Sequence, residues 1–320
     1  MLSYLFKRLF RGFITFFIAV SITFLILRLM PGDPTTLLIG PNMTMEERMI
    51  LLNDYGLDKP FILQYFLYLK ELIQGNLGIS FIHREPVLKI IMGRLPWTLL
   101  LMGVTQLVTA SVGIPLGVIA ARKKGSNVDQ LINTFTIFGI SIFIPWLGVT
   151  LLYFFGYINH FFPIGGAYMP WNEGAGLIFI KDVIHHMILP VLTLSVIYLA
   201  NYVLYMRSSM IDILSEDYIR TARAKGLKER KVVWKHGVKN GLIPTVTMAG
   251  LLLGRMVGGA VLTETVYSYP GVGRMIYEAV GKQDFPVLQG AFIILAFSVI
   301  LMNIITDLIY AYLDPRIKVG

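Results

Sequence analysis

Cysteine is absent from the 320-residue sequence, and charged residues make up only 15% of it. The absence of cysteine excludes structural disulfides, thiolate metal sites and a cysteine nucleophile. The scarcity of charge, beside 55% hydrophobic residues, excludes intrinsic disorder, because disordered chains are polar and highly charged. The hydrophobic residues occur in long blocks and not on alternating faces. This pattern disfavours a soluble enzyme core and indicates membrane spans.

Signatures of catalysis are missing as well. The sequence has no Walker A motif for nucleotide phosphates, no His-Glu-x-x-His zinc motif and no Gly-x-Ser-x-Gly nucleophile elbow. His185 and His186 are adjacent, but neighbouring residues on a helix point in different directions, which argues against a shared metal ion. We therefore predict a chain that is not an enzyme and has no metal site or cofactor of its own.

Six hydrophobic blocks are long enough to cross a hydrocarbon core of about 30 Å, and in lipid they must be helices. The sequence thus predicts an all-α integral membrane protein with six transmembrane helices. The blocks lie near residues 10–30, 95–121, 131–156, 187–206, 242–263 and 287–312. The expected parts are the N-terminus with the first helix (1–30), an extracytoplasmic segment (31–94), a transmembrane core (95–312) that includes an inner loop (207–241), and a C-terminal tail (313–320).

The basic residues predict how these helices are oriented. With the N-terminus inside, the inner segments hold 17 of the 28 Lys and Arg residues, and the much longer outer segments hold 9. Basic residues collect on the cytoplasmic side of membrane proteins. We therefore expect both termini and the inner loop to be cytoplasmic. The net charge of +9 then reflects topology and not nucleic-acid binding.

The expected extracytoplasmic segment contains a short hydrophobic run at residues 61–73. Thirteen residues are too few to span the membrane. We interpret the run as an amphipathic helix that lies at the outer interface or is folded over the pore mouth. The alternative is a helix that merely caps the bundle.

The inner loop contains a second short helical pattern. Ser215 or Asp217 can cap its N-terminus, and Gly226 can end it in the left-handed conformation that glycine adopts without strain. The small residues Ala222 and Ala224, if they lie on the helix surface, would let it dock closely into a groove. The alternative is a solvated basic loop without a partner.

Arg255 falls about midway along the fifth block, where a charged side chain needs a partner or an aqueous cavity. Our hypothesis is that Arg255 lines a translocation path and attracts a substrate carboxylate. The alternative is a structural ion pair or a contact with helix carbonyls.

Small residues and prolines also predict how the helices meet. The spacings Gly113-x-x-x-Gly117 and Gly254-x-x-x-Gly258 permit close helix approach within a bundle or at a subunit interface. Pro115, Pro145 and Pro190 can bend the helices of their blocks.

Several motifs follow one another in order along nearly the whole chain. They are Pro31-Gly32-Asp33-Pro34, residues 55–60 (Tyr-Gly-Leu-Asp-Lys-Pro), residues 94–98 (Arg-Leu-Pro-Trp-Thr), residues 217–227 of the inner loop, residues 264–273, residues 284–287 and residues 314–318. Together these motifs resemble those of ABC importer permeases of the oligopeptide/dipeptide class. The resemblance is specific because many motifs match in the same order.

The resemblance implies the fold of type I importer permeases (MetI-like) and a subunit that forms the translocation pathway for di- or oligopeptides. It implies a second, homologous permease, two ATPase subunits that carry ATP and Mg²⁺, and an extracytoplasmic substrate-binding protein. It places the chain in the cytoplasmic membrane of a bacterium or archaeon. Finally, it implies that the inner loop forms an ATPase-coupling helix with Asp217, Tyr218, Ala222, Ala224 and Gly226 at the coupling site.

This sequence departs from the wider importer consensus in the inner loop, because Arg220 and Thr221 stand where Glu and the first Ala would be. Two alternatives to a peptide permease are left open. One is a permease of the same class for nickel, glutathione or another small solute. The other is a secondary transporter, although paired acids at mid-membrane and inverted repeats are not visible in the sequence.

Overall fold

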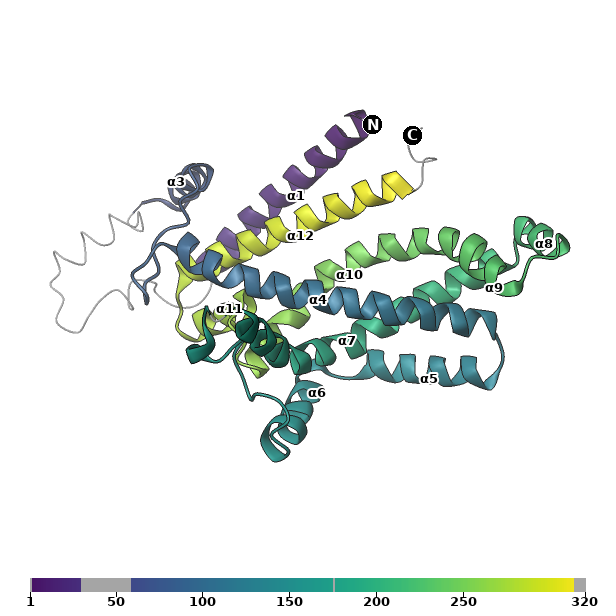
Figure 1. The fold of residues 1–320 in the computed structure, drawn as a ribbon. Coiled ribbons are helices and arrows are strands. Elements are labelled where there is room, and N and C mark those ends of the chain that lie inside the picture. Colours follow the sequence, from purple (N-terminus) through teal and green to yellow (C-terminus); the bar gives the residue numbers. More distant parts are fainter. Residues whose placement is uncertain (1, 30–58, 175, 314–320) are drawn as a thin grey trace.

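The computed structural model describes residues 2–29, 59–174 and 176–313, and these form a bundle of long helices (Figure 1). The helix α3 lies at one end of the bundle and α8 at the other; we refer to these as the α3 end and the α8 end. The elements are α1 (Leu2–Leu29), α3 (Phe61–Ile73), α4 (Val87–Arg122), α5 (Asn127–Ser141), α6 (Ile144–Leu151), the π-helix η1 (Leu152–Ile158), the 3-10 helix η2 (Pro170–Asn172), α7 (Leu177–Leu214), α8 (Asp217–Ala224), α9 (Glu229–Lys231), the π-helix η3 (Val232–Gly237), α10 (Val238–Val266), α11 (Val272–Gly281) and α12 (Phe285–Leu313).

Four of these helices, α1, α4, α7 and α12, are long and apolar enough to cross a membrane without interruption. Two further spans are bent. One consists of α5, α6 and η1 and is bent by 99° between Ser141 and Ile144. The other runs from Glu229 to Val266, which includes α10, and is bent by 49° between Gly254 and Met256. If each bent pair is counted as one span, the total is six, as the hydrophobic blocks predict.

The third block, expected over residues 131–156, is broken into two helices. Ile142 and Phe143 are extended, and a new helix begins at Ile144. Pro145 stands in the first turn of that helix, where its missing N–H needs no partner, whereas in the interior of a longer helix it would remove a hydrogen bond. The expected bend at Pro145 is confirmed, but it takes the form of a sharp break. The helices α4 and α7 continue through Pro115 and Pro190, so bends at those two residues stay predictions.

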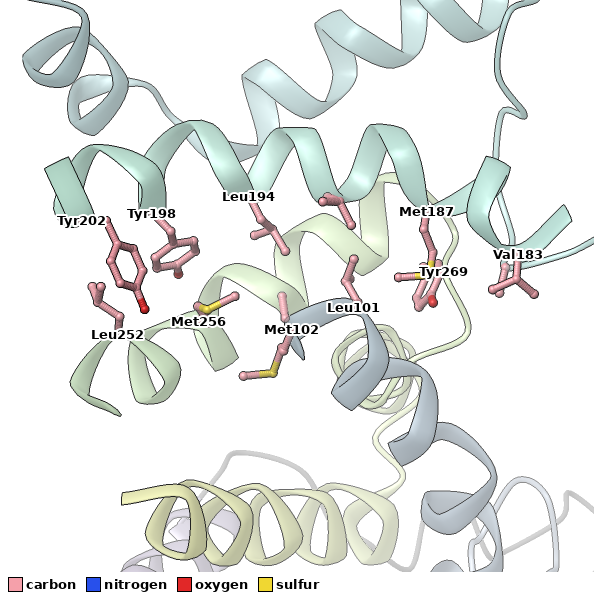
Figure 2. Packing of buried hydrophobic residues seen from close by; sticks show 13 residues of the cluster. Leu101, Met102, Val183, Met187, Leu194, Tyr198, Tyr202, Leu252, Met256 and Tyr269 are labelled. Carbon is pink, nitrogen blue, oxygen red and sulfur yellow. The ribbon is translucent and has the colours of Figure 1, made fainter. Parts of the chain in front are cut away.

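The central core forms where α4, α7 and α10 meet. Leu101 of α4, Leu194 of α7 and Met256 of α10 converge there (Figure 2) and are fully buried. Tyr198 and Tyr202 continue the same face of α7 toward the α8 end. Burial of large apolar side chains from three spans holds these helices together by close packing, which drives helix association in lipid.

Two glycines bring α4 against α7. A Cβ atom at Gly113 would lie 2.6 Å from Tyr202 Cβ, and one at Gly117 would lie 2.7 Å from Met206 Cβ. The prediction that this spacing serves close helix packing is confirmed. For the spacing Gly254-x-x-x-Gly258, a Cβ atom at Gly258 would have no described atom of another element within 4 Å. The role of this second spacing in helix packing therefore stays a prediction.

A buried carboxylate joins α4 to the segment after α10. Glu264 is fully buried; it accepts hydrogen bonds from Thr98 Oγ1 at 2.7 Å and from the backbone N–H of Arg274 at 3.1 Å. Thr98 Oγ1 accepts in turn from the backbone N–H of Val272 at 2.8 Å. A Cβ at Gly271 would clash with the carboxylate. Two of the sequence motifs therefore meet in one hydrogen-bonded anchor.

The helix α3 has the bounds predicted for the short hydrophobic run and lies against the end of α1. The Phe24 ring of α1 contacts the rings of Phe61, Tyr65 and Tyr68 at centroid distances of 5.5, 5.3 and 5.3 Å. The hydroxyls of Ser21 and Tyr65 are 2.6 Å apart. None of the α3 residues is buried. This exposed hydrophobic helix beside a span favours the interface interpretation over a lid on the central helices.

Candidate functional site: the loop between α7 and α10

The inner loop is a compact unit at the α8 end, built around a small core of its own (Figure 1). Ile219 and Ala222 of α8 are buried against Val232 of η3, with Leu214 and Leu227 packed around them. The loop is therefore not a solvated chain, because it buries apolar side chains that hold α8 in a fixed position between α7 and α10.

Gly226 ends α8 as the sequence predicts. Its φ angle is +75°, in the left-handed region that glycine adopts without strain. Its N–H donates to the Arg223 carbonyl at 2.9 Å, and the N–H of Leu227 reaches back to the Ala222 carbonyl at 3.4 Å. These two bonds form a Schellman motif, which satisfies carbonyls that the helix end would leave without partners.

The N-terminus of α8 differs from the expectation. Glu216 occupies the N-cap position, and no side chain makes a capping hydrogen bond there. Ser215 Oγ donates instead to the Asp212 carbonyl at 2.6 Å, at the end of α7. The prediction of a Ser215 or Asp217 cap is therefore wrong: α7 extends to Leu214, so Ser215 serves the end of α7 and not the start of α8.

An arginine fastens the loop on itself. Arg223 Nε and Nη2 donate to the two carboxylate oxygens of Glu229 at 3.2 and 2.9 Å, and Nη1 donates to the Leu214 carbonyl at 3.4 Å. One side chain thus connects α8, the start of α9 and the end of α7. A bidentate guanidinium–carboxylate pair fixes geometry as well as distance.

A second contact ties α8 to α10. Asn240 Nδ2 donates to the Tyr218 hydroxyl at 2.9 Å. Tyr218 is 41% exposed, so its ring is partly available on the surface of the loop. The helix α8 is therefore hydrogen-bonded both to the end of α7, through Arg223, and to α10, through Tyr218.

The predicted coupling residues divide between two faces of α8. Asp217, Tyr218, Ala224 and Gly226 are exposed. Ala222 is only 8% exposed, so the expectation that it lies on the docking surface is wrong. It stands three residues after the fully buried Ile219, and residues at this spacing share a helix face. The ATPase-coupling role of these residues stays a prediction.

Arg255 lies in α10, and its side chain falls outside the described part of the structure. The hypothesis that Arg255 faces a translocation path therefore stays a prediction.

The two adjacent histidines have separate surroundings. His186 Nδ1 lies 2.8 Å from the Asp182 carbonyl, whereas His185 Nε2 lies 2.9 Å from the Phe161 carbonyl. In the ranges that the structure describes, no group of three or more His, Asp or Glu side chains is placed to hold a metal ion.

An ion pair that sequence reasoning missed braces the base of this loop. Arg207 of α7 donates from Nε and Nη2 to the two oxygens of Asp129 of α5, at 2.7 and 2.8 Å. Asp129 is buried and also accepts from the backbone N–H of Gly125 at 2.9 Å. The sequence does contain a signal for such a pair, because Asp129 is the single acidic residue in the short basic segment 122–130. In the same way, Glu229 is the single acidic residue between Lys225 and Lys231.

The solved structure of the inward-facing MetNI methionine ABC transporter has a similar fold. The TM-score is 0.56 at 18% identity, and the match covers 71% of this chain and 97% of that one. This similarity shows a shared type I importer permease fold.

Two curated relatives are similar over almost the whole chain. The oligopeptide transport system permease protein AppB of Bacillus subtilis (strain 168) is 38% identical over 298 residues, which is 93% of each chain. The dipeptide transport system permease protein DppB of Escherichia coli (strain K12) is 37% identical over 339 aligned positions, which covers 99% of each chain.

The family described as "Binding-protein-dependent transport system inner membrane component" matches residues 113–319. Its N-terminal counterpart, described as "Binding-prot-dependent transport system membrane comp, N-term", matches residues 1–102. Together the two matches cover nearly the whole sequence. The chain is a multi-pass membrane protein that belongs to the family of inner membrane components of binding-protein-dependent transport systems.

Proposed function

We propose that this chain is the permease subunit of an ATP-driven importer and forms the translocation pathway for di- or oligopeptides. The names of the two similar relatives support a peptide substrate. The observation that carries the mechanism is the way α8 is held: it has an exposed surface, and hydrogen bonds link it to the end of α7 and to α10. Nickel, glutathione and other small solutes are the substrates to be tested against peptides.

We propose that the α8 end faces the cytoplasm and that both termini lie on that side. The start of α1 lies toward this end of the bundle, as does the turn between α4 and α5 (Figure 1). That turn carries Arg122, Lys123 and Lys124, and the loop around α8 adds further basic residues. Basic segments on one side of a membrane protein indicate its cytoplasmic face.

In the proposed mechanism, the α8 surface is the contact through which ATPase subunits drive the spans. Two such subunits carry ATP and Mg²⁺, a second homologous permease completes the pathway, and an extracytoplasmic protein delivers the substrate; this chain needs no cofactor of its own. ATP must favour one conformation of the bundle over the other, because a ligand that binds both equally shifts nothing. The loop transmits this preference to α7 and α10.

The proposal is tested by purification and transport. The chain is expressed with the products of its neighbouring genes, purified in detergent and reconstituted into proteoliposomes. We expect ATPase subunits to co-purify and to drive ATP-dependent uptake of a labelled dipeptide that exceeds uptake of nickel. Uptake by this chain alone, driven by an ion gradient, would instead show a secondary transporter.

Replacing Gly226 by valine is expected to lower peptide-stimulated ATP hydrolysis and uptake without loss of membrane insertion. A β-branched residue at φ +75° is strained, and a left-handed conformation costs an ordinary residue about 1–2 kcal/mol. The matched control is Gly226→Asn, because asparagine tolerates this conformation and no described atom lies within 4 Å of an added Cβ. Equal activity of the two variants would contradict a role for this turn in coupling.

Replacing Arg255 by glutamine tests the proposed path residue. If Arg255 attracts a substrate carboxylate, the variant should take up a dipeptide several-fold more slowly, whereas uptake of the same dipeptide with an amidated C-terminus should fall much less. The measurement is initial uptake at sub-saturating substrate. An equal loss for both peptides would indicate the structural alternative.

A further inference from the structure

A groove of about 730 Å³ opens at the α3 end, between α1, α3 and the start of α12. Its walls are largely apolar and include Leu27 of α1, Leu67 of α3 and Ile293 of α12. Sites of this volume with apolar walls and a few polar groups are typical of pockets for small organic molecules. No residue of this groove belongs to the coupling loop.

The polar groups of the groove carry charges of both signs. Arg28, at the end of α1, lies with its guanidinium carbon 5.5 Å from the centre of the Phe24 ring. Lys59, just before α3, is the second cation of the lining. Glu71 supplies a carboxylate to the same groove and accepts a hydrogen bond from Asn76 Nδ2 at 2.7 Å. A ligand that pairs with all three side chains carries both an anionic and a cationic group.

The groove lies at the level of lipid headgroups. Arg28 is in the last turn of an apolar span, where long basic side chains extend from the hydrocarbon to the interface. The helix α3 exposes Phe61, Ile62, Phe66 and Ile73, which are 48, 69, 61 and 87% exposed. A short helix with such a surface lies in the interface with its apolar side chains in the membrane. The groove beneath α3 therefore opens into the headgroup layer.

We propose that this groove binds the phosphoethanolamine headgroup of a glycerophospholipid. Arg28 and Lys59 hold the phosphate, Glu71 accepts hydrogen bonds from the ammonium group, and the acyl chains leave along Leu27 and Ile293. A choline headgroup has no N–H to donate, and a glycerol headgroup has no cation to face Glu71. Free phosphate would leave the apolar walls unfilled. The bound lipid joins α3 to α1 and α12.

The test measures lipid that stays bound to the protein. The full chain, purified in detergent with its co-purifying subunits, is incubated with synthetic phosphatidylethanolamine, phosphatidylcholine or phosphatidylglycerol. After gel filtration, the lipid per chain is quantified by mass spectrometry. We expect a clear preference for phosphatidylethanolamine. Arg28→Gln should lower its retention about tenfold, because hydrogen bonds to charged groups are lost.

Two further variants separate the headgroup contacts. Glu71→Gln should remove the preference for ethanolamine over choline and leave phosphate binding in place. Lys59→Gln, outside the span, should lower retention in the same direction as Arg28→Gln and so tests the phosphate contact independently of α1. The matched control is Lys70→Gln, which removes a positive charge from α3 at a position outside the groove, next to Glu71, and should retain lipid normally.

The proposal is overturned if the protein binds the three lipids equally, or if it prefers phosphatidylglycerol. It is also overturned if Arg28→Gln and Lys59→Gln retain as much phosphatidylethanolamine as the unaltered protein. Transport activity is not the readout, so failure of the proposed peptide import would leave this result intact.

Discussion

Replacing Arg223 by glutamate is expected to lower ATP-driven uptake strongly while the protein still inserts into the membrane, because two carboxylates would face each other where an ion pair now closes the loop. The arginine connects Glu229 with the Leu214 carbonyl. The new carboxylate would stand opposite Glu229, so the pair would repel and the loop would open between α8 and α9. A force applied to α8 would then deform the loop instead of moving α7 and α10.

A charge exchange provides the control. In the double variant Arg223→Glu with Glu229→Arg, the ion pair can form again, and we expect most of the uptake to return. Because both side chains are about 40% exposed, the pair contributes little to global stability, and the thermal unfolding midpoint should change little in both variants. A single variant with full uptake, or a double variant without recovery, would contradict the coupling role of this pair.

Replacing Gly117 by leucine is expected to prevent stable folding of the bundle. A Cβ atom at this position would already lie 2.7 Å from Met206 Cβ and 2.9 Å from the Val203 carbonyl oxygen. Neither atom can move without shifting α7, since both are backbone or directly attached to it. Overpacking of a close contact costs about 1–3 kcal/mol or more, and the larger leucine side chain should separate α4 from α7 altogether. The measurement is the fraction of monodisperse protein after gel filtration, with the unfolding midpoint where enough material survives.

Gly103 is the matched control for this substitution. It lies on the same helix, is exposed, and would place a new Cβ within 4 Å of no described atom. Gly103→Leu should therefore be tolerated, and replacing a helical glycine can even stabilise the helix by up to about 1 kcal/mol. If both leucine variants behave alike, the close approach of α4 and α7 does not limit the stability of this protein.

Elements that depend on local sequence could be predicted well. The run at residues 61–73 forms α3 with those bounds, because a short hydrophobic helix needs no information from distant residues. Gly226 ends α8 for the same reason. The six blocks correspond to the spans and bent pairs, since lipid leaves a hydrophobic segment few alternatives to a helix.

Features that depend on residues far apart could not be predicted. Pro145 predicted a bend in the third block, but not that Ile142 and Phe143 would be extended and would separate two helices. The inward direction of Ala222 follows from packing against Val232, which belongs to a later helix. The sequence alone does not show that Glu229 pairs with Arg223, because several other basic residues are close to Glu229 in the chain and each could have formed the ion pair.

The anchor around Glu264 has a consequence for the biogenesis of this protein. Its hydrogen-bond donor Thr98 is 166 residues earlier in the chain, so α4 leaves the ribosome long before the carboxylate does. Before α10 is inserted, the Thr98 hydroxyl lacks this acceptor. Among the hydrogen bonds of the described residues, Thr98 is also the single buried side chain that donates to Glu264. A polar group left without partners in hydrocarbon is costly. We therefore expect the early helices to remain near the exit of the insertion machinery until the fifth span is delivered, and to be released into lipid only after the segment around Arg274 has been synthesised.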